Sequence, residues 1–192
     1  APGYGLSEEL LVEWLQLKND PSIEVASKWG YEYTANFDPK AITHEVKDHS
    51  LRMLKKQWKQ SKRLLPYLTT YQIHSATFNT GVLENKEVIN ELTHLQSKYD
   101  LKIGLTTSGD NQIEVLKAAL EHDLFDVFQV TYNIFDQSLS NFMLKQNFED
   151  KRLVIKEGLA NGRIFQNNHF PNYAESYKLL ASLASKYNVG FD

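Results

Sequence analysis

Polar side chains that can carry acid–base chemistry stand directly after two apolar stretches of the sequence. Lys28 ends the stretch at residues 23–27, and His74 ends the stretch at residues 68–73. An ammonium at the end of a buried strand is costly unless it is paired or used, and it can act as a fixed charge that lowers the pKa of a neighbour. A histidine exchanges protons near neutral pH, although it can equally be a hydrogen-bonded core residue. Lys28 and His74 are therefore the first candidates for a catalytic pair.

The later apolar stretches end in hydroxyl, amide or ammonium groups. These groups belong to Thr106, Thr107, Gln129, Asn133 and Lys156. If the stretches are parallel strands, their carboxyl ends share one edge or mouth and the polar groups converge there. Loops also begin where strands end, which is a simpler explanation for any one of these residues. The remaining histidines stand at no metal-ligand spacing, so we expect surface or packing roles for them and no metal site. They are His44, His49, His94, His122 and His169.

The elements that must position these groups alternate between strands and helices. The predicted strands are residues 23–27, 68–73, 101–105, 126–130 and 152–155. The first predicted helix begins after Ser7, which is its expected N-cap. Four further helices are predicted at residues 44–62, 85–99, 113–120 and 139–144, and the last follows Pro171. A long loop rich in aromatic residues is expected between residue 29 and the second helix. The later strands are one helix plus one strand apart, which is the rhythm of a parallel α/β sheet.

Two α/β architectures fit this rhythm, namely a doubly wound open sheet and a (β/α) barrel. A barrel brings every strand end to one mouth, where it can form a single site. The glycine fingerprint that binds dinucleotides in doubly wound sheets is absent from the sequence. We therefore predict a barrel that forms a single domain over residues 1–192.

Composition limits the function further. The chain has 192 residues, no cysteine and a formal net charge of −3. The lack of cysteine excludes disulfides, thiolate metal sites and cysteine nucleophiles. The charge balance, without a clustered basic arm, argues against nucleic acid and anionic membranes as partners. No apolar stretch approaches the roughly 20 residues of a membrane span, and we expect a cytoplasmic protein.

Several motifs together resemble the aldo-keto reductase family. They are Gly3-Tyr4-Gly5-Leu6-Ser7-Glu8, Ser27-Lys28, Tyr71-Gln72-Ile73-His74, Lys102-Ile103-Gly104-Leu105 and the segment 155–163, in the family's order. The resemblance implies a (β/α)₈ TIM barrel that uses NADPH or NADH to transfer a hydride to or from an aldehyde, ketone or sugar carbonyl. It also implies that Tyr4 is the general acid, that Lys28 lowers the pKa of this tyrosine, and that His74 orients the carbonyl.

The resemblance also assigns residues to the cofactor. Thr106 and Thr107 lie where a Ser-Asn pair holds the nicotinamide carboxamide, and Gln129 is the third partner. The segment similar to the family's seventh strand adds Lys156, Gly158, Leu159 and Gly162. Lys156 departs from the pattern, because an aromatic residue that stacks on the nicotinamide is usual there.

The match covers only the third to the seventh strand of the family's barrel. The aspartate that pairs the lysine in the family would precede Ala1, and the last strand would follow Asp192. A partial barrel exposes two strand edges, so we expect a longer polypeptide, a homo-oligomer or a partner that covers them. Two other functions stay open, namely a lyase in which Lys28 forms a Schiff base and a catalytically inactive binding or assembly subunit.

Overall fold

The computed structural model describes residues 6–190 except residues 110, 147, 149 and 168. The chain divides into two compact units. The first is made of Ala1–Val130 and Phe148–Val154, and the second of Thr131–Asn147 and Ile155–Asp192. The single domain expected from the sequence stays a prediction.

The main sheet has five strands in the order β1-β4-β5-β6-β7. These strands are β1 (Val25–Trp29), β4 (Leu68–Ile73), β5 (Lys102–Thr106), β6 (Phe125–Thr131) and β7 (Arg152–Lys156). The pairs β1–β4, β4–β5 and β5–β6 are parallel. The predicted α/β class and the parallel strands are confirmed, and each strand lies within two residues of its expected position.

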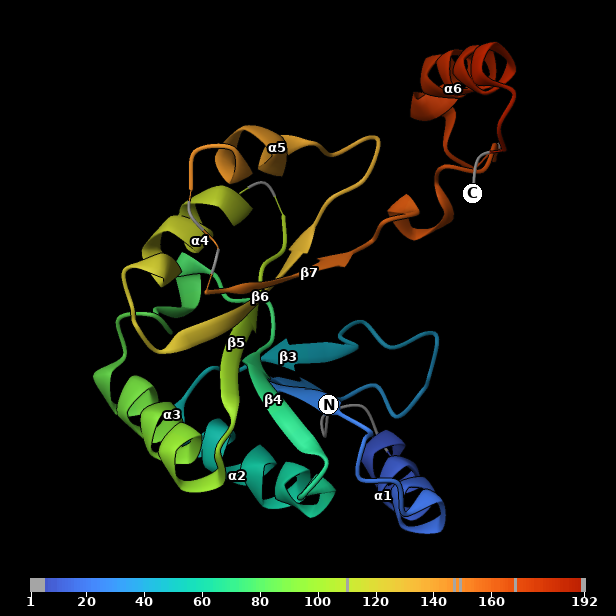
Figure 1. The fold of residues 1–192 in the computed structure, drawn as a ribbon. Coiled ribbons are helices and arrows are strands. Elements are labelled where there is room, and N and C mark those ends of the chain that lie inside the picture. The colour runs from blue at the N-terminus through green and yellow to red at the C-terminus, as the bar shows by residue number, and fades with distance from the viewer. Residues whose placement is uncertain (1–5, 110, 147, 149, 168, 191–192) are drawn as a thin grey trace. The chain divides into compact units, whose positions relative to one another are not determined.

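Helices separate the strands along the chain (Figure 1). They are α1 (Ser7–Lys18), α2 (Leu51–Ser61), α3 (Lys86–Tyr99), α4 (Gln112–Leu120), α5 (Ser138–Met143) and α6 (Ala174–Tyr187). In the first unit α2 packs on β1, α3 packs on β5, and the two helices pack on each other. Among the described residues, no helix combines the length and the apolar character that crossing a bilayer requires.

Short 3₁₀ turns complete the connections. They are η1 (Lys62–Leu64), η2 (Phe78–Thr80), η3 (Ala160–Gly162) and η4 (Pro171–Tyr173). Helix α3 begins as predicted, because the Asn85 side chain accepts a hydrogen bond from the backbone N–H of Val88 at 3.3 Å. The prediction for α1 was wrong in its cap: Ser7 lies inside the first turn, and Leu6 occupies the cap position without a side-chain bond.

The segment before α2 differs most from the expectation. The helix predicted from residue 44 begins only at Leu51, where Ser50 is the N-cap and accepts from the N–H of Met53 at 3.2 Å. The preceding residues form β3 (Glu45–Lys47), which pairs antiparallel with β2 (Tyr31–Tyr33). The expected loop is therefore a two-stranded ribbon, and its β2 strand begins two residues after the end of β1.

The core of the first unit lies around the central strands. Ile73, Ile103, Leu105, Phe128 and Val130 are fully buried. Strands β4 and β5 are buried on both faces, as expected for a parallel sheet that is covered on both sides. This packing fixes the strand ends, and the polar residues that follow them inherit defined positions.

Candidate active site

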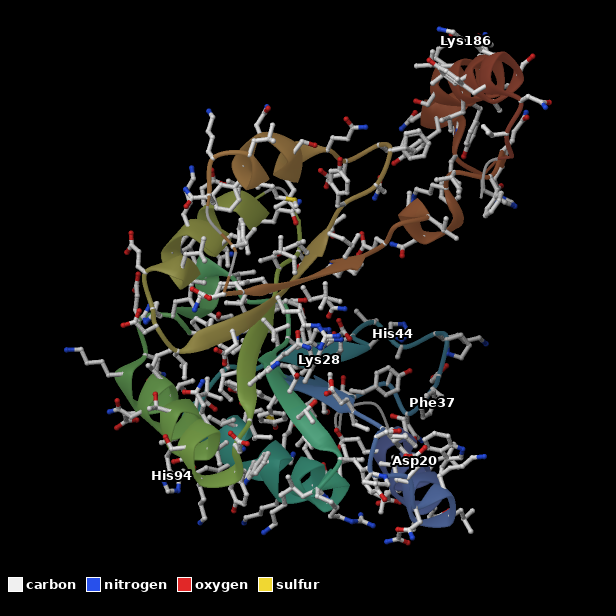
Figure 2. All side chains as sticks on the ribbon, in the orientation of Figure 1. Asp20, Lys28, Phe37, His44, His94 and Lys186 are labelled. Carbon is white, nitrogen blue, oxygen red and sulfur yellow. The ribbon has the colours of Figure 1, made fainter. Side chains whose placement is uncertain are left out.

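The two candidate catalytic residues Lys28 and His74 stand at the carboxyl ends of adjacent strands. Lys28 pairs in register with Gln72 across the β1–β4 ladder. The next ladder bond runs from the N–H of His74 to the carbonyl oxygen of Trp29 at 2.8 Å. The structure therefore brings the predicted lysine and histidine to the same end of the sheet (Figure 2, where Lys28 is labelled).

Burial controls the protonation of His74. The pKa of His74 is lowered from 6.5 to about 4, chiefly by burial and in part by the charge of Lys28. Lys47 and the ring of His49 act in the same direction. His74 is therefore neutral at pH 7, and a neutral imidazole carries one N–H donor and one acceptor nitrogen. This is the form that can donate a hydrogen bond to a carbonyl oxygen without changing its own charge.

Aromatic and cationic groups flank His74 on the ribbon side. The ring of Tyr31 meets the His74 ring edge to face, with centroids 4.7 Å apart. The Lys47 ammonium lies 5.3 Å from the centre of the Tyr31 ring and donates to the carbonyl oxygen of Ser75 at 3.0 Å. Phe37 and His44 lie on the β2–β3 connection, away from Lys28 (Figure 2).

The third predicted catalytic residue, Tyr4, lies outside the described residues. The helix that follows it in the chain is anchored close to Lys28. Glu8 in the first turn of α1 is buried, accepts a hydrogen bond from the hydroxyl of Ser27, and accepts another from Ser61 at 3.0 Å. Ser27 is the residue before Lys28, so a buried carboxylate ties the start of α1 to the strand that carries the lysine.

The two predicted cofactor threonines are buried at the end of β5. The hydroxyl oxygen of Thr106 accepts from the N–H of Ser75 at 2.7 Å, and the Thr106 carbonyl accepts from the N–H of Ala76 at 2.8 Å. The Thr107 hydroxyl donates to the Gln112 side chain at 3.4 Å. Both hydroxyls hold the main chain or side chains around the site, and their contact with a nicotinamide stays a prediction.

Gln129 lies on a cavity in the face of the sheet. This sheet cavity has a volume of about 200 Å³, and its lining includes Lys28, Gln72 and Gln129. The side-chain amide oxygen Oε1 of Gln72 is buried and has no hydrogen-bond partner among the described residues. An amide ligand with N–H donors suits this lining, because a buried acceptor without a partner is costly.

The remaining predicted cofactor residues belong to the second unit. The Lys156 ammonium donates to the adjacent Glu157 carboxylate at 2.9 Å. Gly158 and Leu159 line an apolar pocket of about 220 Å³ with residues of α6. Gly162 has a φ of +83°. The pairing with Glu157 gives Lys156 a local role, and contact of all four residues with a cofactor stays a prediction.

One residue near His74 was missed by the sequence reasoning, which treated His49 as a surface or packing residue. It is 5% exposed and lies between the ends of β1 and β4. The residue that could have revealed His49 is Gly30. Its φ of +112° and its close approach to the His49 ring both require glycine. Among the described residues, no cluster of three or more His, Asp or Glu side chains could bind a metal.

Comparison with known proteins gives structural likeness only. No family model and no curated protein matches the chain. Aldo-keto reductase AKR11C1 from Bacillus halodurans, in its holo form, is 21% identical with a TM-score of 0.65, over 85% of this chain and 52% of its own length. PA4992 from Pseudomonas aeruginosa, assigned to the aldo-keto reductases, is 24% identical with a TM-score of 0.61, over 85% of this chain and 60% of its own.

A third structure covers almost the whole chain. Glycerol dehydrogenase AKR11B4 from Gluconobacter oxydans is 19% identical with a TM-score of 0.69, over 98% of this chain and 62% of its own length. The chain thus spans between half and two thirds of each of these structures. It has the α/β fold of aldo-keto reductases, a TIM-barrel fold, over part of that fold's length.

Proposed function

We propose that this chain carries the catalytic groups of an NAD(P)H-dependent oxidoreductase of the aldo-keto reductase type. The substrate is an aldehyde, ketone or sugar carbonyl, or the corresponding alcohol. The observation that carries the proposal is the placement of Lys28 and a neutral His74 on adjacent strand ends. The fold of the structural neighbours supports it.

Proton delivery is the task of the chain's own residues. Reduction of a carbonyl leaves charge on its oxygen, and a phenol with its ordinary pKa near 10 is a poor donor at neutral pH. A nearby ammonium stabilises the phenolate and lowers this pKa. Lys28 supplies the ammonium, Tyr4 supplies the proton, and the N–H of neutral His74 holds the substrate oxygen in place.

The position of Glu8 supports the role of Tyr4. Glu8 is bonded to Ser27, the neighbour of Lys28. Tyr4 therefore stands only four residues before a side chain that is fixed on the strand carrying the lysine.

The cofactor supplies the hydride when it is bound. Gln129 is the residue best suited to hold a nicotinamide carboxamide, because its amide borders the sheet cavity together with Lys28 and the unpartnered Gln72 oxygen. Thr106 and Thr107 support this site indirectly, because their hydroxyls fix the end of β5 and the turn after His74. Lys156, Gly158, Leu159 and Gly162 are proposed as cofactor contacts within the second unit.

The experiment is NADPH oxidation by the purified chain with a panel of small aldehydes and ketones. We expect His74→Gln and Lys28→Met each to lower kcat by at least about 100-fold, within the range usual for general acid–base groups. His94→Gln and Lys59→Met are matched controls on exposed faces of α3 and α2, and both should keep parental activity.

Two results would overturn this function. The first is full turnover by Tyr4→Phe, because the proton would then come from elsewhere. The second is trapping of substrate on Lys28 by borohydride, which indicates Schiff-base chemistry instead of hydride transfer. Tryptophan quenching by NADPH provides an independent measure of cofactor binding, since buried Trp29 directly follows Lys28.

A further inference from the structure

The ring of His49 joins the strand ends that carry the two catalytic candidates. Its Nε2 lies 2.9 Å from the carbonyl oxygen of His74, and its Nδ1 lies 2.9 Å from the hydroxyl oxygen of Thr80. The ring is also in edge-to-face contact with Trp29, at 5.6 Å between centroids. His49 therefore contacts the residue after Lys28 and the main chain of His74 at the same time.

Gly30 makes room for this ring. A Cβ at position 30 would lie 2.3 Å from the Cδ2 of His49, so the ring would have to move. The backbone of Gly30 is fixed on both sides, because its N–H donates to the Gln57 side chain at 2.8 Å and its carbonyl accepts from Asp48 at 2.9 Å. The ring thus lies against a rigid segment two residues beyond Lys28.

The hydrogen-bond partners determine the tautomer of His49. The carbonyl oxygen of His74 only accepts, so Nε2 must carry the proton. Thr80 has one hydroxyl hydrogen and two acceptors within reach, Nδ1 of His49 and the carbonyl of Thr77 at 3.0 Å. In a neutral ring Nδ1 accepts that hydrogen. Burial lowers the pKa of His49 to about 4, although the hydrogen bond to the His74 carbonyl acts against this, so the neutral form dominates at pH 7.

Side-chain hydrogen bonds hold the main chain of the turn after His74. Ser75 has a φ of +53°, a left-handed conformation that a serine rarely adopts. Its N–H is held by the Thr106 hydroxyl and its carbonyl by the Lys47 ammonium. The carbonyl of His74, one peptide earlier, is held by His49. Three side chains, Thr106 at the end of β5, Lys47 at the end of β3 and His49 between β3 and α2, therefore fix the two peptides that follow His74.

We propose that His49 is a positioning residue for the reaction, which fixes the main chain of His74 through its Nε2–H and so directs the His74 ring toward the substrate carbonyl. This role rests on the proposed function, because it matters for catalysis only if His74 touches the substrate. His49 itself stays behind the site and takes no part in proton transfer.

The variants separate the hydrogen bond from mere space filling. In His49→Gln the amide N–H can still reach the His74 carbonyl, whereas His49→Leu fills the space without a donor. We expect His49→Leu to lower kcat about tenfold or more with little change in KM, because small misplacements of a catalytic group are costly. His49→Gln should restore most of that loss, and His94→Leu, on the exposed face of α3, is the control.

A second measurement is independent of activity. In ¹⁵N-labelled protein without cofactor, NMR should show the Nε2–H tautomer for His49 and a His74 ring that stays neutral well below pH 6. Burial is the main cause of the low pKa of His74. In His49→Leu the unanchored His74 ring should gain contact with water, so its titration should move up toward 6.5, whereas His49→Gln should keep the ring buried and the titration low. Unchanged kcat and unchanged His74 titration in folded His49→Leu would overturn the proposal.

The design also separates failure of the inference from failure of the function. A parent chain that shows this tautomer and titration but oxidises no NADPH contradicts the proposed function and leaves the contact between His49 and His74 established. If His49→Leu does not fold, the parent spectrum still decides, because an Nδ1–H tautomer at pH 7 excludes donation from Nε2 to the His74 carbonyl.

Discussion

His49 and His74 are two neighbouring imidazoles that are kept uncharged, and this has a consequence for stability. Burial lowers the pKa of both rings from 6.5 to about 4. Between these values the unfolded chain binds more protons than the folded chain, so stability rises with pH. The two neutral histidines make their full contribution to the free energy of unfolding above pH 6.5, and this contribution is lost as the pH falls through 4.

We therefore expect the urea midpoint of the chain to fall steadily from pH 7 to pH 4. The double variant with His49→Gln and His74→Gln should show a flatter profile over this window, although it is less stable at pH 7. His94→Gln, which removes an exposed imidazole, should leave the slope unchanged. A parental midpoint that rises as the pH falls from 6.5 to 4 would contradict the burial of these rings.

Single catalytic candidates were predicted from the sequence by their position directly after apolar stretches. That reasoning found Lys28 and His74, because the end of a buried strand is a position that local patterns reveal. It missed His49, because the position of the His49 ring depends on a contact with a carbonyl 25 residues away and on the absence of a side chain at Gly30. Such a contact depends on the packed ribbon β2–β3, which the local pattern did not predict.

The element that begins nearest the site is α1, and its anchor is a buried carboxylate. Glu8 accepts hydrogen bonds from Ser27 on β1 and from Ser61 on α2. Removing it leaves two buried hydroxyls without an acceptor, and this costs about 1–3 kcal/mol. It also frees the helix start that leads to Tyr4.

We expect Glu8→Ala to lower the free energy of unfolding by about 2 kcal/mol in urea denaturation, and to lower NADPH turnover where Tyr4 is the acid. Glu9→Ala is the matched control, because Glu9 is exposed and its only described charge partner is Arg63 at 3.6 Å. The control should change stability by less than about 0.5 kcal/mol. Equal losses for both variants would contradict the role of the buried carboxylate.

Strands were easier to predict than the helix that follows the ribbon. Continuous apolar runs such as residues 68–73 leave few alternatives, because both faces of a central parallel strand are buried. Residues 44–50 contain helix-compatible residues, yet Glu45–Lys47 pair with Tyr31–Tyr33 instead. Tertiary pairing decides such segments, and the Ser50 cap marks where the helix really begins.

At the scale of the whole molecule, the sheet has two edges. Strands β1 and β7 are the outer members of the five-stranded order, and a barrel of this fold pairs every strand on both sides. The chain spans 52–62% of its structural neighbours, which agrees with a sheet that is not closed. Strand edges offer unpaired backbone groups to other chains, so the partner or homo-oligomer expected from the sequence has a physical reason.

We expect the 192-residue chain to self-associate in a concentration-dependent way, as measured by sedimentation velocity. Ile155 on the edge strand β7 is 45% exposed, and Ile155→Lys adds a charge of the kind that protects natural strand edges. This variant should shift the population toward the monomer while the far-UV circular dichroism stays unchanged. Leu17→Lys is the control, because Leu17 is 85% exposed and belongs to helix α1, not to a strand of the sheet. A chain that stays monomeric at high concentration, or that responds equally to both substitutions, would show that the strand edges do not drive association.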